Sequence, residues 1–253
     1  MDITIFKDIK QTSQPFYRDV DIIINRIKNG ASKEIVKKIR AEKNKDTRKL
    51  LKAKLPAICF SGKFSKRADN ALIEHSGVIC LDFDEYKTKK AMLEEKQRLS
   101  KDKNVFSVFV SPSGNGLKVL VKIPPKVENH RSYFISLQNH FNSKNFDRSC
   151  KNVSRVCYES YDPLIYTNHL SSLWDKIEEQ QYVEVMRNID MPTIPVTDGK
   201  KITDILIRWW AKKYPWVEGN RNNHTYILAA AFNDYGINQS LAEHIFLSNY
   251  QSS

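Results

Sequence analysis

Long apolar runs, paired cysteines and the phosphate-binding loop of ATPases are all missing from this sequence. No hydrophobic stretch approaches the roughly 18–20 residues of a transmembrane helix, and the opening residues, MDIT, lack the basic and apolar segments of a signal peptide. Neither GxxxxGKS nor GxxxxGKT occurs, which excludes a P-loop ATPase on this chain. We therefore expect a cytoplasmic protein with no membrane partner.

The cysteines are few and widely spaced. The four are Cys59, Cys80, Cys150 and Cys157, and no two of them form a CxxC pair. A zinc site would need closer pairing of its ligands. Since Cys59 and Cys80 lie inside apolar runs, we expect buried, reduced thiols rather than a zinc centre.

Positive charge dominates what is present. The formal net charge is +12, and ten lysine and arginine residues fall within residues 33–54 beside an apolar stripe. Such an excess indicates a polyanionic partner, most commonly nucleic acid, although a solvated helix face would have a similar local composition. The residues that we assign to nucleic-acid contact are Lys37, Arg40, Lys45, Arg48 and Lys52.

An apolar run that starts at Val78 ends in two carboxylates, Asp82 and Asp84. A strand directs residues i and i+2 to one face, so these two side chains would project together, while Phe83 and Glu85 turn to the opposite face. Carboxylates that repel one another are suited to a hard divalent cation, Mg²⁺ or Mn²⁺. An acidic turn after a buried strand has the same pattern, and both interpretations stay open.

The segment SPSGNGLK at residues 111–118 joins two predicted strands, 105–110 and 117–123. Its small residues and glycines allow backbone N–H groups to approach a ligand. Lys118 begins the second strand on the face opposite Leu117, where an ammonium group could reach a phosphate. A plain Asn-Gly hairpin is an equally good interpretation.

Strand and helix patterns alternate up to about residue 185, which predicts an α/β or α+β domain over residues 1–185. Asp162 and Pro163 suggest a turn. Residues 186–200 predict a linker, and residues 201–253 predict a small helical domain with a capping box at 240–243. The other predicted strands are 3–6, 55–60 and 156–159, and the other predicted helices are 20–28, one capped by Ser32, 89–99 and 130–141.

The order of these motifs resembles the archaeo-eukaryotic primase superfamily, the primase-polymerases. The segments that carry the resemblance are LPAICFSGKF, HSGVICLDFDEY, SPSGNGLKV and FDRSCKNVSRVCYESYDP, and the likeness is closest to the bacterial VirE N-terminal-domain type. It implies an α+β, RRM-like catalytic core with a mixed or antiparallel sheet and flanking helices. The segment GNRNNHTYILAAAFNDYGI resembles the small helical domain that often follows such cores.

The resemblance implies a template-dependent nucleotidyltransferase that makes or extends primers on single-stranded DNA. Two divalent ions, Mg²⁺ or Mn²⁺, would be held by Asp82, Asp84 and Asp147. Family members commonly carry a histidine where this chain has Lys118, and a lysine supplies positive charge without the hydrogen-bond geometry of imidazole. The residues that would contact the incoming NTP or dNTP are Ser111, Ser113, Gly114, Gly116, Lys118 and Arg155.

The helical domain and the partners complete this expectation. The polar segment at 218–224 is either a loop with a helix N-cap or an initiating-nucleotide site made by Arg221, Asn222 and His224. We expect a monomer that works beside a separate helicase, in a mobile element, a phage-like module or a CRISPR-linked operon. Two alternatives remain: a non-catalytic replication initiator or single-stranded nucleic-acid-binding module, and a metal-dependent nuclease.

Overall fold

The computed structural model describes residues 1–177, 199–214 and 221–250. The chain divides into two compact units, Met1–Val183 and Glu184–Ser253. Most of the predicted linker, residues 186–198, lies outside the described residues, and a helix already begins at Gly199. None of the helices within the described ranges has the length and apolar character needed to cross a membrane.

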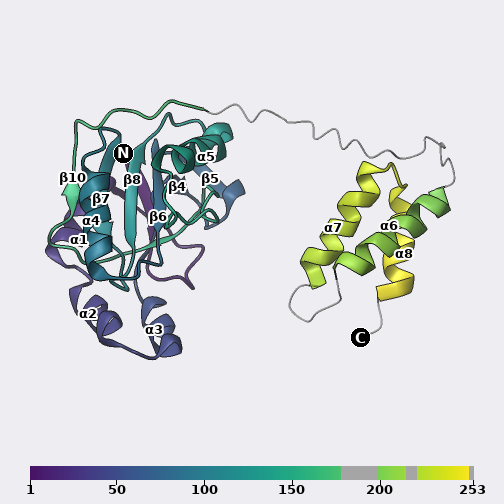
Figure 1. Cartoon of the computed structure of the whole chain (residues 1–253), viewed down its shortest axis with the longest axis horizontal. Coiled ribbons are helices and arrows are strands. Elements are labelled where there is room, and N and C mark those ends of the chain that lie inside the picture. The colour runs from purple at the N-terminus through teal and green to yellow at the C-terminus, as the bar shows by residue number, and fades with distance from the viewer. Residues whose placement is uncertain (178–198, 215–220, 251–253) are drawn as a thin grey trace. The chain divides into compact units, whose positions relative to one another are not determined.

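Antiparallel strands form the framework of the first unit (Figure 1). In its described residues one sheet has the order β2-β1-β3-β9 and a second has the order β10-β7-β8-β6, while β4 pairs with β5. Every pairing among these strands is antiparallel, which confirms the α+β class. The bounds are β1 Asp2–Phe6, β2 Phe16–Asp19, β3 Ala57–Cys59, β4 Gly62–Phe64, β5 Leu72–His75, β6 Val78–Phe83, β7 Val105–Val110, β8 Leu117–Lys122, β9 Cys157–Tyr158 and β10 Tyr166–Thr167.

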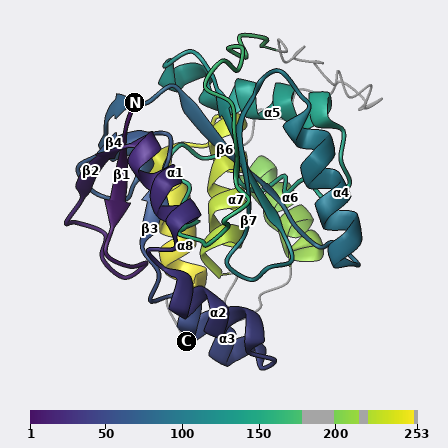
Figure 2. The ribbon, with the colours of Figure 1, turned by 90° about the vertical axis from the view of Figure 1, so that its left-hand side faces the viewer.

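Helices cover the second sheet and extend one end of the unit. Strands β6 and β7 lie between α1 on one side and α4 and α5 on the other (Figure 2). Helices α2 and α3 lie together at the same end of the unit in both views (Figures 1 and 2). The helix bounds are α1 Val20–Asn29, α2 Lys33–Ala41, α3 Lys45–Lys52, α4 Lys89–Ser100 and α5 His130–Phe141.

Strand β6 is buried along its whole length because two layers cover its faces. Ile79, Leu81 and Phe83 pack in a hydrophobic core with α4 and α5. Val78 and Cys80 pack in a second core with α1 and the first sheet. A strand covered on both faces has a continuous apolar sequence, which explains the apolar residues from Val78 onward. The carboxylate that follows on the second face therefore lies at the end of a buried layer.

Elements with a strong local pattern match the prediction. Strand 105–110 and helix 130–141 are confirmed to the residue. The first helix ends at Gly30, whose φ of 85° is the left-handed conformation that glycine adopts readily. Ser32 precedes α2 as expected, but its hydroxyl does not cap the helix; it donates to the Glu159 carboxylate instead. The prediction missed β2, β4, β5 and β10.

The second unit contains three described helices, α6 Gly199–Lys213, α7 Arg221–Asp234 and α8 Gln239–Tyr250, as the helical pattern predicted. They pack around a core that includes Trp210 and Phe232. The predicted capping box at 240–243 was wrong by two residues. The Asn238 side chain accepts a hydrogen bond from Ser240 N at 2.8 Å, so Asn238 caps α8.

Candidate metal centre

Asp82 and Lys118 face each other across the β6–β8 ladder. Lys118 Nζ lies 2.5 Å from Asp82 Oδ1, and both side chains are largely buried. Burial favours the neutral amine, but the Asp82 carboxylate and neighbouring acidic groups outweigh it and raise the pKa of Lys118 above its ordinary value. The lysine is therefore a fixed cation on one oxygen of Asp82.

A loop that follows α5 brings Asp147 and Cys150 to the same place. Phe146 bridges to Phe83 at the end of β6, and Asp147 N donates to Asp82 O at 2.8 Å. Cys150 Sγ lies 2.9 Å from Asp147 Oδ2 and 3.4 Å from Asp82 Oδ2. Three possible ligand atoms, one from each of Asp82, Asp147 and Cys150, lie within 4.8 Å of one another.

The protein holds Asp147 and Cys150 in defined charge states. Partial burial acts to raise the pKa of Asp147, but hydrogen bonds from Cys150 and Ser149 outweigh it and keep that pKa below its usual value. Burial, together with the Asp82 carboxylate, raises the pKa of the Cys150 thiol. Arg155 Nη2 lies 3.7 Å from Asp147 Oδ2, so Arg155 lies beside the cluster. The cluster thus combines two carboxylates, a thiol and two cations.

Asp84 lies just beyond the end of β6 and is not one of the three convergent groups. Asp84 N donates to Asn145 O at 2.8 Å, and Asn145 Nδ2 donates to Asp84 O at 2.7 Å. Burial raises the pKa of Asp84, and the Asp82 carboxylate acts in the same direction against Lys118. A Cβ atom at Gly116 would come within 2.1 Å of Asp84 Oδ1, so a glycine at that position lets the carboxylate approach.

Glu85 does not follow the strand parity that we used to exclude it. Strand β6 ends at Phe83, and Glu85 has a φ of 63°. Glu85 lines a cavity of about 330 Å³ together with Asp84 and Asp147. The reasoning from alternation was wrong here because the backbone leaves the extended conformation before residue 85.

The segment 111–118 forms the predicted hairpin between β7 and β8. Ser111 N donates to Gly116 O at 2.8 Å, and Gly114 N donates to Ser111 O at 2.9 Å. These two N–H groups are therefore used within the turn, and Gly114 has the positive φ that the turn requires. The hydroxyls of Ser111 and Ser113 lie 3.2 Å apart.

The predicted nucleic-acid contacts divide into two groups. Arg40 Nη2 donates to Ser111 O at 3.2 Å and to Tyr161 O at 2.8 Å, which ties α2 to the hairpin. Lys52 is half-buried, and burial, reinforced by the charge of Lys118, lowers the pKa of its amine. Arg48 Nε donates to Glu42 O at 3.0 Å and closes the turn between α2 and α3. The other two, Lys37 and Lys45, are exposed on the helix surfaces.

Two features of this region escaped the prediction. Cys150 carries no sequence signal other than its place three residues after Asp147, and the long-range bridge at Phe146 is what brings it to Asp82. Asp162 begins the predicted turn, in which Ile165 N donates to Asp162 O at 3.1 Å, but its burial and its contact with Lys96 Nζ at 2.6 Å were not predicted. All four cysteines lie in described segments, are buried as expected and form no disulfide.

The proposed initiating-nucleotide residues belong to the second unit. Arg221 and Asn222 begin α7, but their side chains lie outside the described residues. The His224 carbonyl accepts a hydrogen bond from Trp210 Nε1 at 2.6 Å, and its ring lies 5.5 Å from that of Tyr214. His224 therefore contributes to the packing of α6 against α7.

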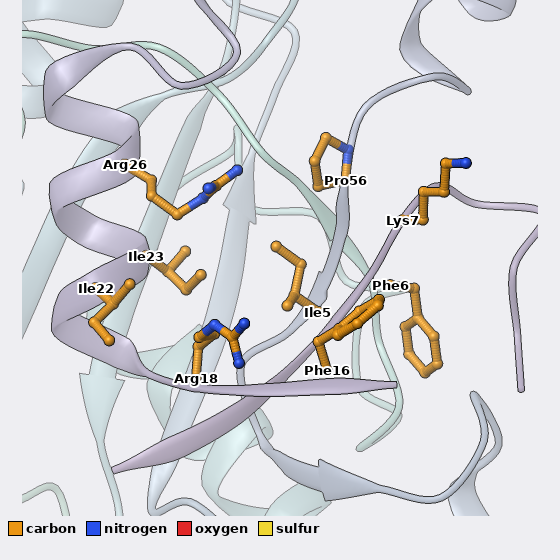
Figure 3. Close-up of a pocket in the computed structure, with 9 residues that line it drawn as sticks. All are labelled: Ile5, Phe6, Lys7, Phe16, Arg18, Ile22, Ile23, Arg26 and Pro56. Carbon is orange, nitrogen blue, oxygen red and sulfur yellow. The ribbon is translucent and has the colours of Figure 1, made fainter. Parts of the chain in front are cut away.

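A second hollow of about 350 Å³ lies on α1, β1 and β2 (Figure 3). Figure 3 shows the guanidinium groups of Arg18 and Arg26 on either side of Ile5 and Ile23. None of the described residues that line it carries a carboxylate. The fully buried Glu159 accepts from Arg26 Nε and Nη2 at 2.6 and 3.1 Å, which fixes that guanidinium beside the hollow. The lining consists of Ile5, Phe6, Lys7, Phe16, Arg18, Ile22, Ile23, Arg26 and Pro56.

These features define an α+β protein with a carboxylate–thiol cluster at the end of a doubly covered strand. Residues 50–166 are similar to the family described as BT4734-like, N-terminal domain. That stretch is less than half of the chain, and it contains the whole cluster and the hairpin but neither α1 nor α2. No curated protein and no solved structure matches the chain.

Proposed function

We propose that the chain is a template-dependent nucleotidyltransferase with a primase-polymerase core that makes or extends primers on single-stranded DNA. The observation that carries this proposal is the convergence of Asp82 and Asp147 beside two cations, Lys118 and Arg155. A triphosphate substrate needs both kinds of charge, since carboxylates hold divalent ions and cations contact phosphate oxygens. The antiparallel sheets and flanking helices fit such a core.

The carboxylates fit Mg²⁺ or Mn²⁺, because these ions bind carboxylate oxygens, and Asp84 and Asp147 line one cavity. Asp82 and Asp147 would hold one ion, and Asp84, which lines the same cavity as Asp147, would take part in holding a second. Two such ions would lower the pKa of an attacking hydroxyl and neutralise the triphosphate. Lys118 orients the Asp82 carboxylate through Oδ1. Arg155 and the half-buried Lys52 are the groups that we assign to phosphate oxygens near the cluster.

In this proposal the single-stranded DNA lies along the basic helices α2 and α3. Helices α2 and α3 carry exposed lysines, and Arg40 ties α2 to the hairpin beside the cluster. A DNA backbone along these helices would approach the cluster without any contact that reads bases. Nucleoside triphosphates, single-stranded DNA and a separate helicase are the partners of this proposal, and the protein acts as a monomer.

Asp147→Asn is the variant that tests the proposal. Asp82→Asn would leave the buried Lys118 without its partner, whereas Asp147 is partly exposed and its replacement spares that pair. Primer synthesis on circular single-stranded DNA, with labelled NTPs or dNTPs and with Mg²⁺ or Mn²⁺, should be lost in Asp147→Asn and kept in Glu94→Gln on the exposed face of α4. Undiminished synthesis by Asp147→Asn would contradict the proposal. Cleavage of labelled strands with Mn²⁺ and no nucleotide would indicate a nuclease.

One observation favours the second candidate, a non-catalytic single-stranded nucleic-acid-binding module. The hollow in Figure 3 combines cations with an apolar floor and the half-exposed ring of Phe16, which suits a base and its phosphate. Binding of labelled single strands that weakens with salt, ignores EDTA and is reduced by Phe16→Ala, with no nucleotide incorporation under any condition, would support this function instead. Leu164→Ala, at an exposed apolar residue outside the hollow, is its control.

A further inference from the structure

The carboxylates of the cluster do not present all of their oxygens equally. Asp82 Oδ1 is held by Lys118 Nζ at 2.5 Å, and Asp147 Oδ1 accepts from Ser149 N at 2.9 Å. The remaining oxygen of each, Oδ2, is turned toward Cys150 Sγ. Groups that fix one end of a carboxylate orient its other end, as outer contacts do around metal ligands.

Cys150 is built into this arrangement. Cys150 is 1% exposed, and its sulfur contacts both inward oxygens, Asp82 Oδ2 and Asp147 Oδ2. Asp82 already has Lys118 as its cation, and Asp147 Oδ2 lies 3.7 Å from Arg155 Nη2. An apolar side chain in place of Cys150 would offer no further donor or ligand atom to the two inward oxygens. The thiol offers them one hydrogen, whereas a metal ion could bind both oxygens and the sulfur.

We propose that Cys150 is a metal ligand, and that Asp82, Asp147 and Cys150 together take a thiophilic divalent ion, with Zn²⁺ bound most tightly and Mn²⁺ ahead of Mg²⁺. The inference rests on the proposed function only for its location at the same cluster. Thiolate ligands favour transition ions, whereas a set of oxygens alone suits Mg²⁺. As the ion–sulfur bond forms, the thiol proton leaves to solvent, so that the bound sulfur is a thiolate. Lys118 keeps its oxygen throughout, because it holds Oδ1 and not Oδ2.

Cobalt is the probe that reports the sulfur directly. Co²⁺ added to the full chain should produce the near-ultraviolet charge-transfer absorption of a cobalt–thiolate bond. Cys150→Ser should lose this absorption, while Cys59→Ser, which changes a buried thiol outside the cluster, should keep it. An excess of Zn²⁺ should remove the band from the unmodified chain, and the same excess of Mg²⁺ should leave it. A band that survives in Cys150→Ser, or equal displacement by Mg²⁺ and Zn²⁺, would overturn the inference.

A measurement on the unmodified chain covers the case in which Cys150→Ser does not fold. In weakly buffered solution near neutral pH, Zn²⁺ binding should release one proton per ion from the thiol. Binding with no proton release would overturn the inference.

The two proposals fail in different ways. A cobalt–thiolate band without any nucleotide incorporation would support Cys150 as a ligand and contradict the polymerase function. Full Mg²⁺-dependent incorporation by Cys150→Ser, with no band in the unmodified chain, would support the polymerase function and contradict Cys150 as a ligand.

Discussion

Among residues 1–177 of the first unit, two buried lysine–aspartate pairs have nearly the same geometry. Lys96 Nζ lies 2.6 Å from Asp162 Oδ2, and Lys118 Nζ lies 2.5 Å from Asp82 Oδ1. None of the four side chains is more than 12% exposed. Distance and burial alone would therefore give the two pairs the same role.

Their surroundings differ. Lys96 also donates to Leu164 O at 2.7 Å, and Asp162 accepts from the backbone N–H groups of Val110 and Leu164 at 2.8 and 3.0 Å. That pair joins α4, β7 and the loop before β10 with its hydrogen bonds satisfied. Asp82, by contrast, turns its second oxygen to a thiol beside another carboxylate. Neutral donors thus complete the Lys96–Asp162 pair, whereas a thiol and a second carboxylate lie beside the Lys118–Asp82 pair.

The largest expected effect comes from breaking the satisfied pair. Lys96→Met keeps the length of the side chain and leaves Asp162 buried without its cation. Removing one partner of a buried pair costs about 3–5 kcal/mol of unfolding free energy. Urea denaturation should show this loss equally with and without Mn²⁺. A loss below about 1 kcal/mol, the range of exposed ion pairs, would contradict the structural role.

Lys118→Met makes the matching change in the other pair, and its effect should depend on metal. Without divalent ions we expect a loss that approaches that of Lys96→Met, since Asp82 is equally buried. A bound ion can replace the missing cation, and binding to the native state at 100 times Kd restores about 2.7 kcal/mol. Thermal unfolding of both variants with and without Mn²⁺ checks the difference. If Mn²⁺ stabilises the two variants alike, the comparison between the pairs is wrong.

The smallest expected effect comes from a change of pH, which leaves both lysine–aspartate pairs intact. His75 Nε2 and His130 Nδ1 lie 3.0 Å apart in the interior. Burial lowers the pKa of both rings, and that of His130 falls to about 4. Because the unfolded chain binds these protons near pH 6.5, unfolding free energy should fall as the pH drops from about 6.5 to about 4, by about 1–3 kcal/mol.

Denaturation at a series of pH values tests this, with two variants for comparison. His130→Gln should flatten the profile, whereas His169→Gln at an exposed ring should leave it unchanged. A profile that is level over this range in the unmodified chain would refute the assignment.

Much of the fold followed from local pattern. Strand β7 and helix α5 carry period-two and helical spacing in unbroken runs, so their bounds were predicted closely. Strand β2 is largely exposed and has no buried face of its own, and it pairs with β1. Strand β10 is two residues long, and its place in the second sheet depends on β7. Such elements are determined by tertiary contacts that the local sequence does not contain.

The candidate site divides in the same way. The pattern of β6 placed Asp82 at a strand end, and the register with β8 then brought Lys118 opposite it. Cys150 joins them through a bridge between residues 83 and 146, a contact that no local spacing indicates. The Asp162-Pro163 sequence predicts a turn, but the burial of Asp162 depends on its contact with Lys96, 66 residues earlier in the chain.

Glu159 gives the order in which this unit can assemble. Its carboxylate meets Arg26 across 133 residues of sequence and Ser32 across 127. During synthesis, the contacts of Arg26 on α1 and of Ser32 before α2 can therefore form only after the segment that carries Glu159 has been made. Contacts of such long sequence separation close slowly, because the loop entropy is lost before the contacts are made. Asp147 and Cys150 lie 12 and 9 residues before Glu159 in the chain, so we expect the cluster of Asp82, Asp147 and Cys150 and the scaffold to be completed in one late folding step.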